Sequence, residues 1–283
     1  MRVLQLIAAL VCSGCAFTAQ ASGIIPQIVS GHGWSTAITI HHAAPYYGKS
    51  GIRLRFYDSG GRPAAPRVAI DGNAVITYVE GATVTPQGLT VGGETRTVTS
   101  LRGANQPLTR EDFTVSVPEM QSVSVRLSPD DPFQGYARVD RASAVWVSAT
   151  LSYAFGGYTS EMRVPLQASE AGFQSFIFDN AGASQTAIAL VNMDFARSLR
   201  AAVLIYDENG VLISNSSATL CPGCQDTFLL RERFPETATA RGIVHFRRDP
   251  SPATSATFGA ISLLAAPTSG AWFASGVLLP TLQ

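Results

Sequence analysis

The stretch Thr36–Ile40, which reads TAITI, decides the fold because it returns as TAIAL at Thr186–Leu190, 150 residues later. A second landmark, FYDSGG at Phe56–Gly61, returns as IYDENG at Ile205–Gly210, 149 residues later. Two landmarks at nearly one offset predict a duplicated unit, and a duplication of this kind sets the architecture of the whole chain.

Alternation of apolar and polar residues predicts that the unit is built of β-strands. The stretches Ile52–Tyr57, Val123–Leu127, Val145–Leu151 and Ala201–Ile205 each place apolar side chains at every second position, which gives a strand one buried face and one wet face. Turn residues rich in Asp, Asn and Gly lie between these runs, and the chain after residue 21 has no sustained helical period. Short strands joined by regular turns predict an all-β sandwich.

Further matches show that the two copies differ in length. The stretches Pro118–Ser122 and Pro222–Asp226 correspond at an offset of 104, and Gly135–Val139 and Gly242–Phe246 at an offset of 107. Because the offset falls by about 45 residues after the first hairpin, copy one contains an insert of that length.

The resulting prediction is two consecutive Ig-like antiparallel β-sandwich domains, the first with a strand-rich hairpin insert. Copy one covers residues 22–167 with the insert at about 62–113, and copy two covers 168–283. We expect removal of Arg62–Phe113 to leave both cores folded. The expected core of copy one is Trp34, Ile38, Ile40, Ile52, Leu54, Phe56, Val145 and Val147; that of copy two is Ile188, Leu190, Val203, Ile205, Ile261, Leu263 and Val277.

The first 21 residues have the organisation of an export signal. Arg2 supplies a positive charge, Val3–Val11 is a short apolar run, and Ala19–Ala21 has the A-x-A form of a cleavage site. The apolar run is shorter than the roughly 20 residues that span a bilayer. We expect cleavage after Ala21 and an exported protein, periplasmic or extracellular; the alternative is a lipoprotein anchored through Cys15.

Composition limits the partners of the chain. Lys and Arg together number 20, as do Asp and Glu, and this balance argues against nucleic acid, which needs a basic face. Charged residues make up 14% and apolar residues 46% of the chain, which favours a packed core over disorder. We expect no nucleic-acid partner, no membrane span in the mature chain and no cofactor. An extracellular protein or a polysaccharide remains as the partner class.

Three motifs of copy one form a recurrent pattern: G-W-x-T at Gly33–Thr36, F-x-D-x-x-G at Phe56–Gly61 and GYARV at Gly135–Val139. The pattern resembles that of tandem β-sandwich repeats in secreted bacterial proteins, many of which are large and multi-domain. The resemblance covers most of residues 24–283, although copy two has Ser184 in place of the tryptophan. It implies a surface or extracellular module of unassigned function, with no assigned active site.

The motif CPGC at Cys221–Cys224 holds the two cysteines that remain after the signal. We expect a structural disulfide on a type II turn, since β-type residues flank the motif and copy one has Val117 and Met120 at the matching positions. Two alternatives remain open: a redox site, which would need a helix N-terminus, and a zinc site, for which His245 is the nearby histidine.

Polar clusters elsewhere in the sequence do not predict catalysis. His32, His41 and His42 form a histidine cluster, but adjacent residues of a strand point to opposite faces, so we expect no metal site. The carboxylate pairs Glu111–Asp112, Asp130–Asp131 and Asp207–Glu208 fall in turns or loops. The G-x-S-x-G and H-E-x-x-H motifs are missing, and we therefore predict that the chain is not an enzyme.

Exposed aromatic residues give the clearest indication of binding. Tyr46 and Tyr47 share a loop, and Trp272 stands at a probable strand start; such rings stack on sugars and anchor protein contacts. The leading expectation is a non-catalytic exported module for adhesion, surface scaffolding or assembly. The alternatives are a carbohydrate-binding module that uses these three residues and a secreted hydrolase, which would need two converging carboxylates or a histidine beside a serine.

Overall fold

The computed structural model describes residues 22–45, 48, 50–81, 83–85, 90–141, 145–155, 158–168, 172–249, 256–266 and 271–275. The predicted signal peptide and Val277 lie outside these residues. The all-β prediction is confirmed: the described chain forms antiparallel sheets, and its helices are one α-helical turn, α1 (Leu230–Arg233), and one 3-10 turn at Pro235–Thr237.

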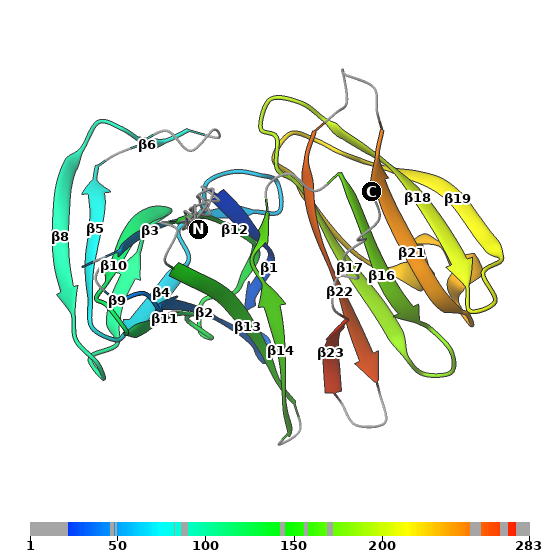
Figure 1. Cartoon of the computed structure of the whole chain (residues 1–283), viewed down its shortest axis with the longest axis horizontal. Helices are drawn as coiled ribbons and strands as arrows, with labels where there is room; N and C mark the ends of the chain where they lie inside the picture. The colour runs from blue at the N-terminus through cyan, green and yellow to red at the C-terminus, as the bar shows by residue number, and fades with distance from the viewer. Residues whose placement is uncertain are drawn as a thin grey trace, which may run out of the picture.

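The first copy is a sandwich of two large sheets (Figure 1). Sheet A has the order β15-β1-β12-β3-β10-β5-β8 and sheet B the order β14-β13-β2-β11-β4-β9, while β6 and β7 form a separate pair. Their bounds are β1 (Ser22–Ser30), β2 (Trp34–His42), β3 (Ser50–Asp58), β4 (Arg67–Asp71), β5 (Ala74–Glu80), β6 (Thr83–Val84), β7 (Thr90–Val91), β8 (Glu94–Ser100), β9 (Gln106–Thr109), β10 (Asp112–Val117), β11 (Ser122–Leu127), β12 (Phe133–Arg141), β13 (Val145–Phe155), β14 (Tyr158–Pro165) and β15 (Gln167–Ala168).

The second copy is a smaller sandwich of two four-stranded sheets. Sheet D has the order β16-β21-β18-β19 and sheet E the order β20-β17-β22-β23. Their bounds are β16 (Phe173–Asp179), β17 (Gln185–Asn192), β18 (Leu199–Asp207), β19 (Leu212–Leu220), β20 (Gln225–Leu229), β21 (Arg241–Arg248), β22 (Phe258–Ala266) and β23 (Ala271–Ser275).

The strand orders of the two copies correspond. The run β1-β12-β3-β10 in sheet A matches β16-β21-β18-β19, and β14-β13-β2-β11 in sheet B matches β23-β22-β17-β20. Ile38 on β2 and Ile188 on β17 therefore occupy the same place in their sandwiches. Apart from the two-residue β15, the strands without a counterpart are β4 to β9, which run from residue 67 to 109, inside the predicted insert.

A matching pair of glycines shows why the repeated sequence gives the same local structure. A Cβ atom on Gly135 would lie 2.0 Å from the Tyr57 carbonyl oxygen, and one on Gly242 would lie 1.9 Å from that of Tyr206. The close approach of two backbones excludes any side chain at both positions, and this explains a glycine in each copy.

The insert widens both sheets and shares the first core. β4 and β9 extend sheet B, and β5 and β8 extend sheet A. Val68, Ile70, Ile76 and Phe113 are at most 1% exposed and belong to the same hydrophobic cluster as Leu54. The expectation that residues 62–113 can be removed without harm to the core is therefore wrong, because the widened sheets need side chains from both halves to close the sandwich.

The predicted core residues are largely confirmed. The first cluster contains all those named for copy one except Trp34, which is partly buried against it; the second contains Ile188, Leu190, Val203 and Ile205. Ile261 and Leu263 are a correction, since they join the first cluster together with Ala187 and Ala189. The strand β22 is apolar on both faces, so alternation along it gives no sign of which core each side chain enters.

The outer face of sheet E thus packs against copy one. Figure 1 shows β14 of the first sandwich beside β22 and β23 of the second, and β14 and β23 contact each other. The side chain of Gln167, at the end of copy one, accepts a hydrogen bond from the Ala260 backbone N–H at 2.9 Å and donates one to the Ala260 carbonyl. The two sandwiches therefore meet through a joint that is both apolar and hydrogen-bonded.

The other end of the joint is built on two turns. The Gln225 N–H donates to the Ser59 carbonyl at 2.9 Å, and the Gln225 side chain donates to the Pro26 carbonyl at 2.7 Å. Tyr136 stacks on Tyr57 with 5.1 Å between ring centroids and donates its hydroxyl hydrogen to the Gly223 carbonyl at 2.7 Å. The CPGC turn of copy two is thus seated on the first hairpin turn of copy one.

Candidate functional site

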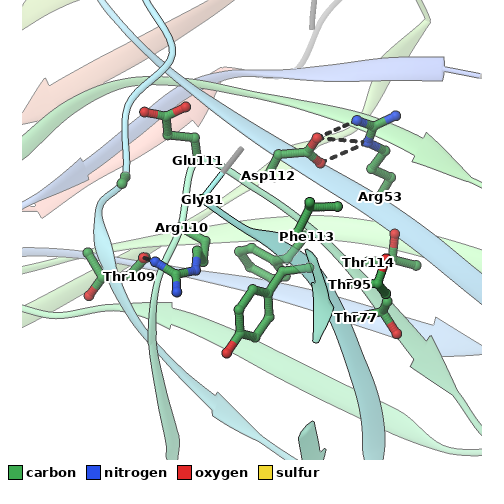
Figure 2. A pocket seen from close by; sticks show the side chains of 13 residues that line it. Arg53, Thr77, Gly81, Thr95, Thr109, Arg110, Glu111, Asp112, Phe113 and Thr114 are labelled. Carbon is green, nitrogen blue, oxygen red and sulfur yellow. Dashed lines mark hydrogen bonds and ion pairs between the residues drawn. The ribbon is translucent and has the colours of Figure 1, made fainter. Parts of the chain in front are cut away.

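A hollow of about 410 Å³ opens between the insert and the strands of sheet A that it extends (Figure 2). Its polar lining consists of hydroxyl groups, guanidinium groups and carboxylates. The lining residues are Arg53, Ala65, Thr77, Tyr78, Val79, Gly81, Thr95, Thr109, Arg110, Glu111, Asp112, Phe113 and Thr114.

Both arginines of this hollow are engaged by carboxylates. Figure 2 shows Asp112 facing Arg53, whose Nε donates to the two Asp112 carboxylate oxygens at 2.8 and 3.1 Å. This hydrogen bonding to Asp112 raises the pKa of Arg53 above its ordinary value, against an opposing effect of burial. Arg110 lies 4.7 Å from the centre of the Tyr78 ring and donates to Glu80 at 3.1 Å.

The lining is consequently neutral overall and rich in hydroxyl groups. Its two guanidinium groups are balanced by the carboxylates of Glu111 and Asp112, so the hollow offers no net charge to an ionic ligand. Four threonines supply donors and acceptors. This chemistry suits a neutral, polar ligand held by hydrogen bonds.

A second surface is the outer face of sheet B. Trp146, His41 and Ser122 lie side by side on β13, β2 and β11, and the next row holds Ser148 and Thr39. Trp146 is 69% exposed, and His41 Nδ1 lies 2.7 Å from the Ser122 hydroxyl. The residues of these two rows are polar apart from the exposed ring of Trp146.

The matching face of copy two has the opposite character. By strand register, Ala189, Val191, Ile261 and Leu263 stand where copy one has Thr39, His41, Ser148 and Thr150. The copy-two residues are at most 7% exposed because copy one covers them. One face of the repeated unit is therefore apolar and buried in copy two, but polar and open in copy one.

The structure does not describe the side chains of the three candidate binding residues that were predicted from the sequence. Tyr46 and Tyr47 lie outside the described residues, and Trp272 lies in β23 opposite Ala265, where only the backbone is described. The structure thus leaves these three residues as a prediction.

Cys221 and Cys224 lie at disulfide-bonding distance, with 5.2 Å between their Cα atoms. This geometry is compatible with an oxidising compartment. Gly223 has φ +70°, as the third residue of a type II turn requires. The residue of copy one that corresponds to Cys224 is Gln121, not Met120. The Gln121 carbonyl accepts a hydrogen bond from the His42 N–H, and the Cys224 carbonyl accepts one from Asn192, the residue that corresponds to His42.

The histidines lie beside serines, the arrangement named above for a hydrolase. His245 Nδ1 is 2.6 Å from the Ser175 hydroxyl, and His42 Nε2 is 3.2 Å from that of Ser50. His42 is fully buried. Ser175 and His245 are cross-strand neighbours on β16 and β21. Within the described residues no hydrogen bond joins His245 to a carboxylate, the third member of a triad.

Sequence reasoning did not single out Trp146 as a candidate contact residue. The signal was present, because the alternation of β13 assigns Val145 and Val147 to the core and hence Trp146 to the wet face. A tryptophan on the polar face of a strand is unusual, since aromatic rings are normally buried.

The chain matches no family model and no curated protein. Within the described residues, no helix is long and apolar enough to cross a membrane. The same residues contain no group of three histidine, cysteine or acidic side chains placed to hold a metal ion.

Proposed function

We propose that the chain is a non-catalytic, exported module for adhesion or assembly, which uses the outer face of sheet B around Trp146 as its contact surface. The N-terminal signal pattern and the cysteine pair at bonding distance support export. The observation that carries the proposal is the contrast between the two matching faces: copy two buries its face in the joint, while copy one leaves the same face exposed.

The joint gives this surface a rigid support. Ala187, Ala189, Ile261 and Leu263 enter the core of copy one, and the Gln167 amide is hydrogen-bonded to both polar backbone groups of Ala260. A contact surface on a rigid body loses less entropy on binding than one on a flexible tether. A two-sandwich body of this kind suits a spacer or scaffold.

The test is retention of cell-envelope material from the organism of origin on the immobilised mature protein. Trp146→Ser should lower retention about tenfold, which is the loss expected for a buried aromatic anchor. The matched control is Leu101→Ser, since Leu101 is 62% exposed but lies on the insert. Equal retention by both variants, or no retention by the wild-type protein, would contradict the proposal.

A second candidate function is carbohydrate binding, favoured by the neutral, hydroxyl-lined hollow of Figure 2. Pull-down on insoluble polysaccharides separates the candidates. Thr95→Val with Thr114→Val removes two hydroxyl groups at nearly constant volume and should reduce retention if the hollow binds sugar. A triple change of Tyr46, Tyr47 and Trp272 to alanine tests the aromatic residues instead. Failure of every polysaccharide to bind would retire this candidate.

A further inference from the structure

The joint within the chain brings together two different surfaces of the repeated unit. Copy one contributes the outward tyrosines Tyr57 and Tyr136, which lie on neighbouring strands of sheet A. Copy two contributes Val191, Phe195 and the CPGC turn, which cover these rings. Because the two surfaces differ, the parts of them that lie on shared strands have counterparts in the other copy, whereas β15, which carries Gln167, has none.

Copy two leaves the counterpart of the tyrosine surface partly exposed, with its two central residues half-buried. Tyr206 and Ile243 take the places of Tyr57 and Tyr136, on β18 and β21, and Leu212 is the cross-strand neighbour of Tyr206. Leu212 is 46% exposed, and Val211, at the end of the adjoining turn, is 57% exposed. These residues form an apolar row across sheet D, and contiguous exposed apolar side chains mark contact surfaces.

The turn beside this row is also open. In the joint, a Cβ on Gly61 would collide with the Gly223 backbone at 2.6 Å. The corresponding Gly210 has nothing within 4 Å of such a Cβ. The seat that the CPGC turn occupies on copy one is therefore present and uncovered on copy two.

Copy one keeps the counterpart of the other surface exposed, on the face of sheet B. Met120, on the turn that corresponds to CPGC, is 63% exposed, and Trp146 is 69% exposed. Trp146 stands in the place of Gly259, whose Cβ would lie 2.7 Å from Ile24. In copy two the residue in the place of Ile24 is the smaller Ser175, which is itself buried beside His245.

We infer that the chain associates with itself head to tail, the sheet B face of one molecule docking on the Tyr206 row of the next. The inference rests on the proposed function, because it names a second copy of this chain as the partner of the Trp146 face. Two different surfaces, one on each copy, give a heterologous contact, which extends beyond the dimer into a chain or a ring. Thr39 and Ser148 replace the alanine and isoleucine of the joint, so the contact between molecules is weaker than the joint and reversible.

Sedimentation equilibrium of the mature protein tests the inference. Between roughly 10 µM and 1 mM, the range of weak interfaces, the weight-average mass of the wild-type protein should rise with concentration and not level off at the dimer. Trp146→Asp and Val211→Asp should each remain monomeric, since each removes one of the two surfaces. Leu101→Asp is the control and should behave as the wild-type protein does.

Mixing the two monomeric variants gives the decisive measurement. Each variant retains the surface that the other has lost, so an equimolar mixture should form a dimer and nothing larger. The dimer would also show that both variants are folded. A wild-type protein that stays monomeric, a mixture that stays monomeric, or an effect of Leu101→Asp would overturn the inference. If envelope material still binds through Trp146 in that case, the proposed function survives without it.

Discussion

Gly61 and Gly223 lie backbone to backbone where the two sandwiches meet, so close that a Cβ on Gly61 would lie 2.6 Å from the Gly223 carbonyl oxygen. The turn of copy two thus fits the turn of copy one only while Gly61 lacks a side chain; a Cβ on Gly223 would instead lie 2.7 Å from the Phe195 ring of its own copy. Sequence repetition alone does not reveal this contact, because Gly61 and Gly223 come from different positions of the repeated unit.

Changing Gly61 to alanine should lower the free energy of unfolding in two ways, by straining the turn and by disturbing the joint. Gly61 and Gly210 have φ values of +77° and +78°, so alanine costs about 1–2 kcal/mol of backbone energy at either position. Only Gly61 also meets another backbone, which adds about 1–3 kcal/mol of overpacking. Urea unfolding should show a larger loss for Gly61→Ala than for Gly210→Ala. Equal losses would show that the contact contributes nothing.

The two stacked tyrosines should respond differently to loss of the hydroxyl. Tyr136→Phe leaves the buried Gly223 carbonyl without its donor and should lower the free energy of unfolding by about 1–3 kcal/mol. Among the described residues the Tyr57 hydroxyl makes no hydrogen bond, so Tyr57→Phe should be neutral or stabilising. Paired denaturation curves check this order, and a reversed order would mean that the hydrogen bond is not formed in solution.

Stability should fall in strongly alkaline solution because of the same pair. Burial raises the pKa of Tyr136 well above its ordinary value, with a further contribution from Tyr57, whose own pKa burial also raises. The unfolded tyrosines ionise near pH 10, so this stability is complete below about pH 10 and is lost as the pH rises toward the folded-state pKa. The free energy of unfolding, measured from pH 9 to 11, should decline less steeply for Tyr136→Phe. An unchanged slope would exclude Tyr136 as the cause.

Reduction of the cysteine pair should have a modest effect. Cys221 and Cys224 enclose a very short loop, and closing so short a loop stabilises by about 1–2 kcal/mol. The Cys221→Ser, Cys224→Ser double variant should therefore stay folded with a slightly lower unfolding midpoint, and dithiothreitol should shift only the wild-type protein. Complete unfolding on reduction would mean that the turn cannot seat on copy one without the bond.

The insert should unfold together with the rest of the first core. Ile70 lies on β4 and is fully buried in the same cluster as Leu54. Ile70→Ala and Leu54→Ala should each cost about 2–5 kcal/mol and shift one shared transition, followed by tryptophan fluorescence and circular dichroism. A separate early transition for Ile70→Ala would show that the insert is an independent unit.

Strand positions and turns were readable from the sequence because local pattern determines them. The alternation along Ile52–Tyr57 required one face to be buried, and β3 places Ile52, Leu54 and Phe56 in the core. The hairpin Phe56–Gly61 and its repeat were likewise predictable from turn residues that tolerate positive φ. These features depend on neighbours within a few residues.

Features that depend on contacts between residues far apart in the sequence could not be predicted from it. Ile261 and Leu263 could have faced either core, since β22 is apolar on both sides, and only the docking of copy two on copy one decides the matter. The predicted offset between Pro118–Ser122 and the CPGC turn was wrong by one residue. Gly223 corresponds to Met120, and the two share a positive φ but no similarity of residue type. The hollow beside Arg110 depends on how the insert folds back, which alternation does not specify.

The contribution of Ala187, Ala189, Ile261 and Leu263 to the neighbouring core has a practical consequence for anyone who prepares fragments. The repeat suggests a domain boundary in the short connection after Gln167. A fragment that ends there would lack the residues of copy two that cover the first core, and it would expose apolar side chains to water. The C-terminal fragment would likewise expose the apolar outer face of sheet E. The duplicated span is therefore smaller than the span that shares the first core, and crystallisation or expression trials should begin with both halves in one polypeptide.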